Sequence, residues 1–164
     1  LGSILIGRII PETGGDTLFS SLSAAFSDLD NDMQDQLQNL NAIHSFEHGF
    51  KESLAEKGGR ERLAEALKEN PPISHPVVKI HPITNKKILY VNRLFTSHIE
   101  GMDVSESDEL LEFLFNHIQK EQFVCRYSWQ PNSIAFWDNR SVLHKPVNDY
   151  WPQLRRMERI TIEG

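Results

Sequence analysis

Trp137-Asp-Asn-Arg-Ser-Val-Leu-His144 closes a strand-like segment with a histidine, and Arg155-Arg-Met-Glu-Arg159 opens another such segment with two arginines. A neutral imidazole is a common ligand of metal ions. A planar guanidinium can hold a carboxylate or a similar anion with paired hydrogen bonds. Together these residues are compatible with a site where an anionic organic acid binds to a metal ion.

Strand-like composition also recurs on both sides of this stretch. Aromatic and β-branched residues gather in short runs, and such runs favour strands. The predicted strands are 4–10, 77–80, 87–91, 123–129, 133–137 and 156–162. Segments 77–80 and 87–91 are expected to pair as a hairpin, and Pro131-Asn132 is expected to form a tight turn. Many short strands with few helices predict a mainly β fold, an antiparallel sandwich or barrel with α insertions.

Helical spacing of apolar residues predicts three helices between the strands. The first runs from about Ser20 to Leu29, and a second, capped by Asp30 or Asn31, runs towards residue 40. A third is expected to begin at Ser105, with Asp108 at the reciprocal position of a capping box, and to end near residue 122.

Residues 45–74 differ from their surroundings because they are rich in charge and carry Gly58-Gly59 and Pro71-Pro72. Glycine and proline pairs make a poor rigid helix. Two interpretations stay open here: a solvated surface insertion, or a mobile lid over a site.

Length and composition limit the class of protein. The 164 residues suffice for one domain, 1–164, with its own core. A formal charge of −6 argues against general nucleic-acid binding. No apolar run reaches transmembrane length and no signal-peptide pattern is present, so no membrane association is expected. The single cysteine, Cys125, is expected in the core and suits a reducing compartment, so we predict a cytoplasmic protein.

Each candidate site residue also has a simpler explanation. His144 alone could be an ordinary polar residue at a strand end. Arg155 and Arg159 lie four residues apart, so in a strand they would point the same way. They could instead be exposed and paired with carboxylates such as Glu158 or Asp149. His98-Ile-Glu100 has the spacing of two metal ligands on a strand end, but a surface pair explains it better.

Several motifs together resemble the taurine dioxygenase family of Fe(II)/2-oxoglutarate-dependent oxygenases, including its alkylsulfatase-type members. These are Gly14-Gly-Asp-Thr-Leu-Phe19, His75-Pro-Val-Val-Lys-Ile-His-Pro82 with Leu89-Tyr-Val-Asn92, Trp129 to His144, and Asp149 to Ile162. The resemblance spans nearly the whole chain. It implies a double-stranded β-helix, or jelly-roll, core.

The resemblance assigns roles to four residues. His144 is similar to the family's second iron-binding histidine. Arg155 matches the arginine that pairs with the distal carboxylate of the co-substrate 2-oxoglutarate, and Thr17 matches a threonine at that same carboxylate. Arg159 matches the arginine that holds the sulfonate or sulfate of the primary substrate. The cofactor implied is Fe(II).

The chain departs from the family pattern at its start. The family's His-x-Asp ligand pair lies upstream of the Gly-Gly-Asp-Thr turn, and the sixteen residues before Thr17 contain no histidine. We therefore expect this chain to be the C-terminal part of an oxygenase domain, with a jelly roll incomplete on its N-terminal side. As it stands, it is not expected to bind iron tightly or to turn over.

The resemblance implies a small anionic organic substrate. The first hypothesis is hydroxylation of a sulfonate or alkyl sulfate ester, with release of sulfite or sulfate, succinate and CO2. A second keeps the reaction but takes a carboxylate-bearing substrate such as an aryloxyacetate, and a third is an inactive jelly roll used for binding or assembly. A homo-oligomer is compatible with each of them.

Overall fold

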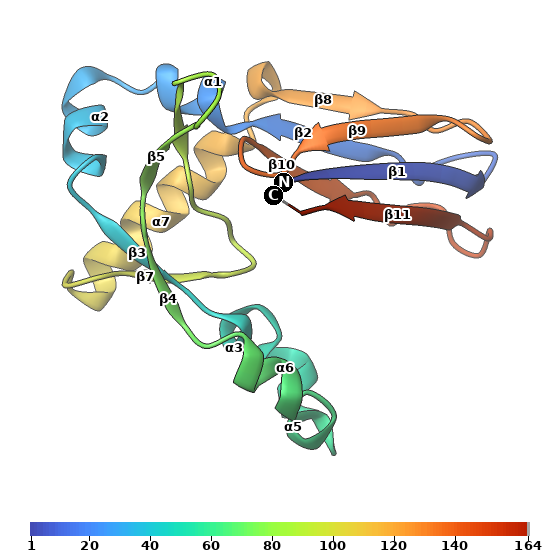
Figure 1. The fold of residues 1–164 in the computed structure, drawn as a ribbon, viewed down its shortest axis with the longest axis horizontal. Coiled ribbons are helices and arrows are strands. Elements are labelled where there is room, and N and C mark those ends of the chain that lie inside the picture. The colour runs from blue at the N-terminus through green and yellow to red at the C-terminus, as the bar shows by residue number, and fades with distance from the viewer. Residues whose placement is uncertain (164) are drawn as a thin grey trace.

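Two three-stranded antiparallel sheets make up one side of the molecule (Figure 1). The structure is a computed structural model that describes residues 1–163. One sheet has the strand order β11-β1-β9 and the other has the order β10-β2-β8. The strands are β1 (Gly2–Ile9), β2 (Thr17–Ser21), β8 (Val124–Tyr127), β9 (Ile134–Asp138), β10 (Val142–Pro146) and β11 (Arg156–Ile162).

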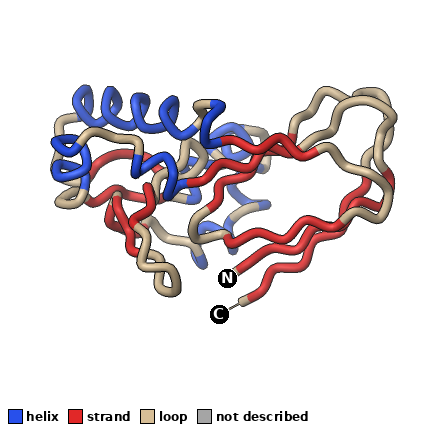
Figure 2. Tube along the Cα trace, turned by 90° about the horizontal axis from the view of Figure 1, so that it is seen from above, coloured by secondary structure: helices blue, strands red, loops and turns tan. Residues whose placement is uncertain are grey.

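Along the chain these six strands switch between the two sheets at every step except from β2 to β8, where the helical core and the third sheet are inserted. β1 lies in the first sheet and β2 in the second, and β8, β9, β10 and β11 then follow as second, first, second and first. This alternation is the winding of a double-stranded β-helix, so the prediction of a mainly β fold with a jelly-roll core and helical insertions is confirmed. The two sheets face each other as separate layers, and within residues 1–163 they do not close into a barrel (Figure 2).

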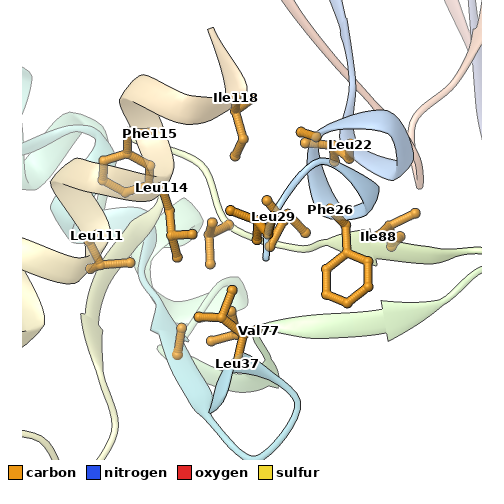
Figure 3. Packing of buried hydrophobic residues seen from close by; sticks show 14 of the residues in the cluster. Leu22, Phe26, Leu29, Leu37, Val77, Ile88, Leu111, Leu114, Phe115 and Ile118 are labelled. Atoms are coloured by element: carbon orange, nitrogen blue, oxygen red, sulfur yellow. The ribbon is translucent and has the colours of Figure 1, made fainter. Parts of the chain in front are cut away.

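The main apolar core lies beside the sheets, under the helices. It is built from α1 (Leu22–Ser27), α2 (Asn31–Leu37) and α7 (Val104–Ile118), which pack on the hairpin β5 (Val78–Ile80) and β6 (Lys87–Leu89) and on a third sheet. Leu37, Leu89 and Leu114 are fully buried there (Figure 3 shows Leu37 and Leu114). The predicted hairpin is confirmed, with Val78 opposite Leu89.

Specific hydrogen bonds join this helical part to the sheets. The Ser20 hydroxyl of β2 donates to the carbonyl of Ile118 at the end of α7, over 2.6 Å in a buried position. His117 Nε2 lies 2.8 Å from the carbonyl of Ala25 in α1. These contacts fix β2 against the core, and β2 in turn carries Thr17 and Phe19.

The third sheet was not predicted from the sequence. It consists of β3 (Asn41–His44), β4 (Ile73–Pro76) and β7 (Thr96–Ile99), in the order β4-β3-β7. Its strands are only four residues long, so they offer little alternation from which to recognise a strand.

Residues 46–69 form four short helices that project from the body (Figure 1). They are α3 (Phe46–Gly49), α4 (Lys51–Ala55), α5 (Gly59–Arg62) and α6 (Ala64–Glu69). Leu54 and Gly59 are their only buried residues, which agrees with a solvated insertion. Motion of this segment as a lid stays a prediction.

Three local predictions need correction. The first helical segment begins as strand β2, so helix α1 starts at Leu22 after the cap Ser21. α7 is capped by Asp103, whose carboxylate accepts from the Ser105 amide, and it ends at Ile118 before the 3-10 turn η1 (Glu121–Phe123). Cys125 is exposed on β8 rather than buried in the core. No helix within residues 1–163 is both long and apolar enough to span a lipid bilayer.

Candidate functional site

His144 lies on β10, directly opposite Phe19 of β2. Its ring centroid is 4.7 Å from that of Trp137 and 6.4 Å from that of Phe19. Partial burial against these rings lowers the pKa of His144, and the positive charge of Arg159 lowers it further. Both effects favour the neutral imidazole, which is the form that binds a metal ion.

Arg155 lies just before β11 and contacts the turn that precedes β2. Its Nε donates to the carbonyl of Gly15 over 3.0 Å. Its Nη2 is buried and has no hydrogen-bond partner within residues 1–163. Gly15 has φ +73°, and a Cβ placed there would come within 3.1 Å of Arg155 Cδ. The guanidinium thus lies against backbone that only glycine fits well.

The nearby carboxylates are engaged elsewhere. Asp149 Oδ1 accepts from the Gly15 amide at 2.8 Å, and Arg126 pairs with Asp16 at 2.6 Å and with Asp149 at 3.6 Å. The simpler explanation of Arg155 as a partner of Asp149 is therefore wrong. A buried guanidinium nitrogen without an acceptor is costly, and an external anion would satisfy it.

Thr17 lies two residues beyond Gly15, at the start of β2, and its side chain is 2% exposed. Side chains two apart on a strand share a face, and His144 stands opposite Phe19, so Thr17 is on the His144 face of the sheet. Trp129 Nε1 donates to Thr17 Oγ1 over 2.9 Å in a buried position. The turn before β2 therefore brings Arg155 to Gly15, two residues from Thr17, and Thr17 is on the same face of the sheet as His144.

Arg159 belongs to the other sheet, on β11 opposite Leu5 of β1. Its Nη2 lies 3.2 Å from Thr161 Oγ1, and Arg159 makes no ion pair within residues 1–163. Glu158, the alternative partner considered from the sequence, pairs instead with Arg8 at 2.7 Å and Arg156 at 3.6 Å. Leu5 and Ser3 share a face of β1, and Trp137 is opposite Ser3, so Arg159 is on the same face of its sheet as Trp137.

The described residues supply only part of a metal centre. A facial iron site needs two histidines and one carboxylate. Residues 1–163 contain no group of three or more His, Cys, Asp or Glu that could hold a metal ion, so His144 is one candidate ligand without two companions. His98 and Glu100 on and beside β7 bond to Ser97 and Ser74 respectively, as a surface pair would.

One buried histidine was given no role from its sequence context. His81 Nδ1 accepts from the amides of Ile83 and Thr84, so Nε2 carries the hydrogen and donates to Asp138 Oδ2 over 3.0 Å. Hydrogen bonds from Arg140 and then His81 hold the pKa of Asp138 well below its usual range. His81 thereby ties the β5–β6 hairpin to the end of β9, next to Trp137. A His-Pro pair in a turn gave no signal of this link.

Comparison with known proteins gives one consistent family. The model of the "Taurine catabolism dioxygenase TauD, TfdA family" matches residues 1–161. An alkylsulfatase of Acinetobacter baylyi is 36% identical over 165 residues, which cover 99% of this chain and 52% of the relative. An alpha-ketoglutarate-dependent 2,4-dichlorophenoxyacetate dioxygenase of a Burkholderia species is also 36% identical, covering 99% of this chain and 53% of the relative.

A solved structure shows the same fold. The crystal structure of a taurine dioxygenase from Burkholderia xenovorans superposes with a TM-score of 0.80 at 31% identity, and covers 96% of this chain and 50% of that one. The chain therefore spans about half the length of these proteins. By its sequence and by its winding of strands, this chain belongs to the TauD/TfdA family of dioxygenases.

Proposed function

We propose that the complete protein is a 2-oxoglutarate-dependent dioxygenase that acts on a small sulfonate or alkyl sulfate ester. The observation that carries the proposal is the buried Nη2 of Arg155, which has no acceptor within residues 1–163, while Nε of the same side chain bonds to Gly15, two residues before Thr17. Membership of a dioxygenase family supplies the reaction class.

Different residues of this chain bind the two anions, 2-oxoglutarate and the substrate. Arg155 and Thr17 hold the distal carboxylate of 2-oxoglutarate, because a guanidinium and a hydroxyl both donate to carboxylate oxygens. His144 provides one ligand to Fe(II), which when bound supplies the activation of dioxygen. Arg159, on the opposite sheet, holds the anionic head group of the substrate. Trp137 and Phe19 pack against the ring of His144.

The proposed reaction inserts one oxygen atom into the C–H bond next to sulfur or to the ester oxygen. The other oxygen atom goes to 2-oxoglutarate, which loses CO2 and becomes succinate. The hydroxylated carbon then expels sulfite or sulfate and becomes an aldehyde. Arg159 orients the substrate so that this carbon, and not the head group, faces His144.

A carboxylate-bearing substrate is the second candidate. It is supported by the 36% identity to a 2,4-dichlorophenoxyacetate dioxygenase, and a guanidinium such as that of Arg159 can bind a carboxylate as well as a sulfonate. The two candidates differ in head group and leaving group but not in co-substrate.

The test is a substrate panel with the purified full-length protein, Fe(II), 2-oxoglutarate and oxygen. Alkylsulfonates, alkyl sulfate esters and aryloxyacetates are compared by succinate formed and by sulfite or sulfate released. Succinate coupled to sulfite or sulfate supports the first candidate. Succinate with aryloxyacetates alone replaces it with the second, and no substrate-dependent succinate with any class overturns both.

A further inference from the structure

The hydroxyl of Thr17 is held in a fixed hydrogen-bonding sense. A threonine hydroxyl carries one hydrogen and can accept through its lone pairs. The indole N–H of Trp129 can only donate, so in their 2.9 Å contact Thr17 Oγ1 is the acceptor. The hydroxyl hydrogen must therefore point away from Trp129.

That hydrogen has no acceptor of its own in the described chain. The Trp129 contact is the only side-chain hydrogen bond of Thr17 within residues 1–163, although Thr17 is 2% exposed. Arg155 Nη2, near the neighbouring Gly15, is likewise a buried donor without an acceptor. One donor is on Thr17 and the other on the side chain that contacts Gly15, two residues before it, and a carboxylate has two oxygens that could accept from both.

The indole itself is held in place. Trp129 is 6% exposed, and the ring of Tyr127 packs edge-on against it with centroids 4.9 Å apart. Tyr127 lies at the end of β8, directly opposite Thr17 in the sheet. The pairing of β2 with β8 therefore positions both Thr17 and Tyr127, and the ring of Tyr127 packs against Trp129, the hydrogen-bond partner of Thr17.

We propose that Trp129 is a positioning residue that commits the Thr17 hydroxyl to donate toward the distal carboxylate of 2-oxoglutarate. This inference rests on the proposed function, because it takes 2-oxoglutarate as the anion at Arg155. Without the indole N–H the Thr17 hydroxyl can rotate to other orientations. The affinity for 2-oxoglutarate then falls, because binding must fix the hydroxyl in one of them.

The experiment measures 2-oxoglutarate affinity by calorimetry on the full-length protein loaded with Mn(II) in the absence of substrate. Trp129→Phe keeps an aromatic ring but removes the N–H, and it is expected to weaken binding by about three- to tenfold, as loss of one neutral hydrogen bond does. Thr17→Val removes the hydroxyl and is expected to weaken binding at least as much. In the Thr17→Val background, Trp129→Phe should then have almost no further effect.

A second ligand distinguishes loss of the Thr17 hydroxyl orientation from general disruption of the fold by Trp129→Phe. 2-Oxopentanoate has a methyl group where 2-oxoglutarate has its distal carboxylate, so its affinity should be the same in Trp129→Phe and the parent protein. A drop for both ligands would mean that Trp129 only supports the fold, and full additivity with Thr17→Val would also overturn the proposal. If neither Thr17→Val nor Arg155→Gln changes 2-oxoglutarate affinity, the proposed co-substrate site itself is wrong.

Discussion

Arg155 is the residue on which the proposed co-substrate site depends most. Replacing it with Gln removes the charge and the fork of donors, so 2-oxoglutarate should bind about ten- to a hundredfold more weakly, the range for a lost charged hydrogen bond. Mn(II) affinity should stay within error, because Arg155 contacts Gly15 and not His144. Calorimetric titration of both ligands measures this.

The neighbouring arginine offers a matched control. Arg156 is exposed and pairs with Glu158 at 3.6 Å, so Arg156→Gln changes the net charge equally without touching the buried site. Equal losses in the two variants would show that general electrostatic attraction, and not the buried contact, binds 2-oxoglutarate.

For individual residues, the sequence could suggest which ones form the site but not which groups they contact. His144, Thr17, Arg155 and Arg159 were identified by resemblance, and their roles stay predictions. Only the structure shows that Arg155 and Arg159 do not pair with Asp149 or Glu158. The reason is physical: Asp149 could reach several cations, and only the folded turn decides that it bonds to Gly15 and Arg126.

Among the elements, the turn from Pro11 to Asp16 holds two left-handed glycines, Gly14 and Gly15, closely packed against other residues. Gly15→Ala should destabilise the protein by about 2–5 kcal/mol, combining the left-handed backbone cost with overpacking. The overpacking arises because the new Cβ would lie 3.0 Å from Pro11 Cγ and 3.1 Å from Arg155 Cδ. The same substitution should weaken 2-oxoglutarate binding by displacing Arg155. Urea unfolding and calorimetry give the two measurements.

Gly58 is the matched control for this prediction. It has φ +75°, close to that of Gly15, but a Cβ there would meet nothing within 4 Å. Gly58→Ala should therefore cost only the backbone term, about 1–2 kcal/mol, and leave 2-oxoglutarate binding unchanged. If Gly15→Ala proves no worse than Gly58→Ala, close packing against Arg155 is not important.

A basic cluster of His44, His75 and Lys79 lies at the third sheet, β4-β3-β7, and it predicts that stability depends on pH. The ring of His44 on β3 lies 5.3 Å from that of His75 and 5.5 Å from that of Tyr90, and Lys79 Nζ is 3.3 Å from His75 Nδ1. Burial, then the charges of His75 and Lys79, lower the pKa of His44 from 6.5 to about 4. The unfolded chain therefore binds a proton at a pH where the folded chain does not.

The sign follows from proton linkage. Since unfolding takes up a proton between pH 6.5 and about 4, the free energy of unfolding should fall as the pH is lowered through that window. Urea unfolding at several pH values measures the slope. His44→Phe keeps a ring between His75 and Tyr90 but cannot titrate, so its slope should be shallower. An unchanged slope would assign the effect to other groups.

How far the elements could be predicted depended on their length and pattern. The helix α7 and the strand β11 were recognisable because apolar residues recur over many positions, and the hairpin because two runs rich in Val and Ile flank a short turn-forming segment. The four-residue strands β3, β4 and β7 were missed because their pairing is set by distant partners, such as Ala42 with His75 and Ile99. The cap of α7 was misplaced because Asp103 and Ser105 are both good capping residues.

For the molecule as a whole, the outer face of the β11-β1-β9 sheet is notable for its exposed apolar side chains. Phe136 and Ile160 both stand beside Ile4 in register and are 68% and 67% exposed, and Ile134 on the same face is 59% exposed. Contiguous apolar patches of this kind promote association. We expect the 164-residue chain to self-associate with rising concentration, as sedimentation velocity would measure.

Substitution should localise the effect. Phe136→Thr combined with Ile160→Thr keeps β propensity and should lower the self-association. Val104→Thr is the control, since Val104 is 74% exposed but lies at the start of α7 and not in that sheet. Equal behaviour of the double variant and the control would place the association elsewhere.

The alternation of strands between the two sheets also sets the order in which the protein can fold during synthesis. β1 is made long before its two neighbours, β9 and β11, with Gly2 pairing with Asp138 and Ile162. The helical core between residues 22 and 123 can assemble before either neighbour leaves the ribosome. Until then β1 lacks both of these partners, so of the strands β1 to β11 it waits longest for pairing and has the greatest need of protection from other chains.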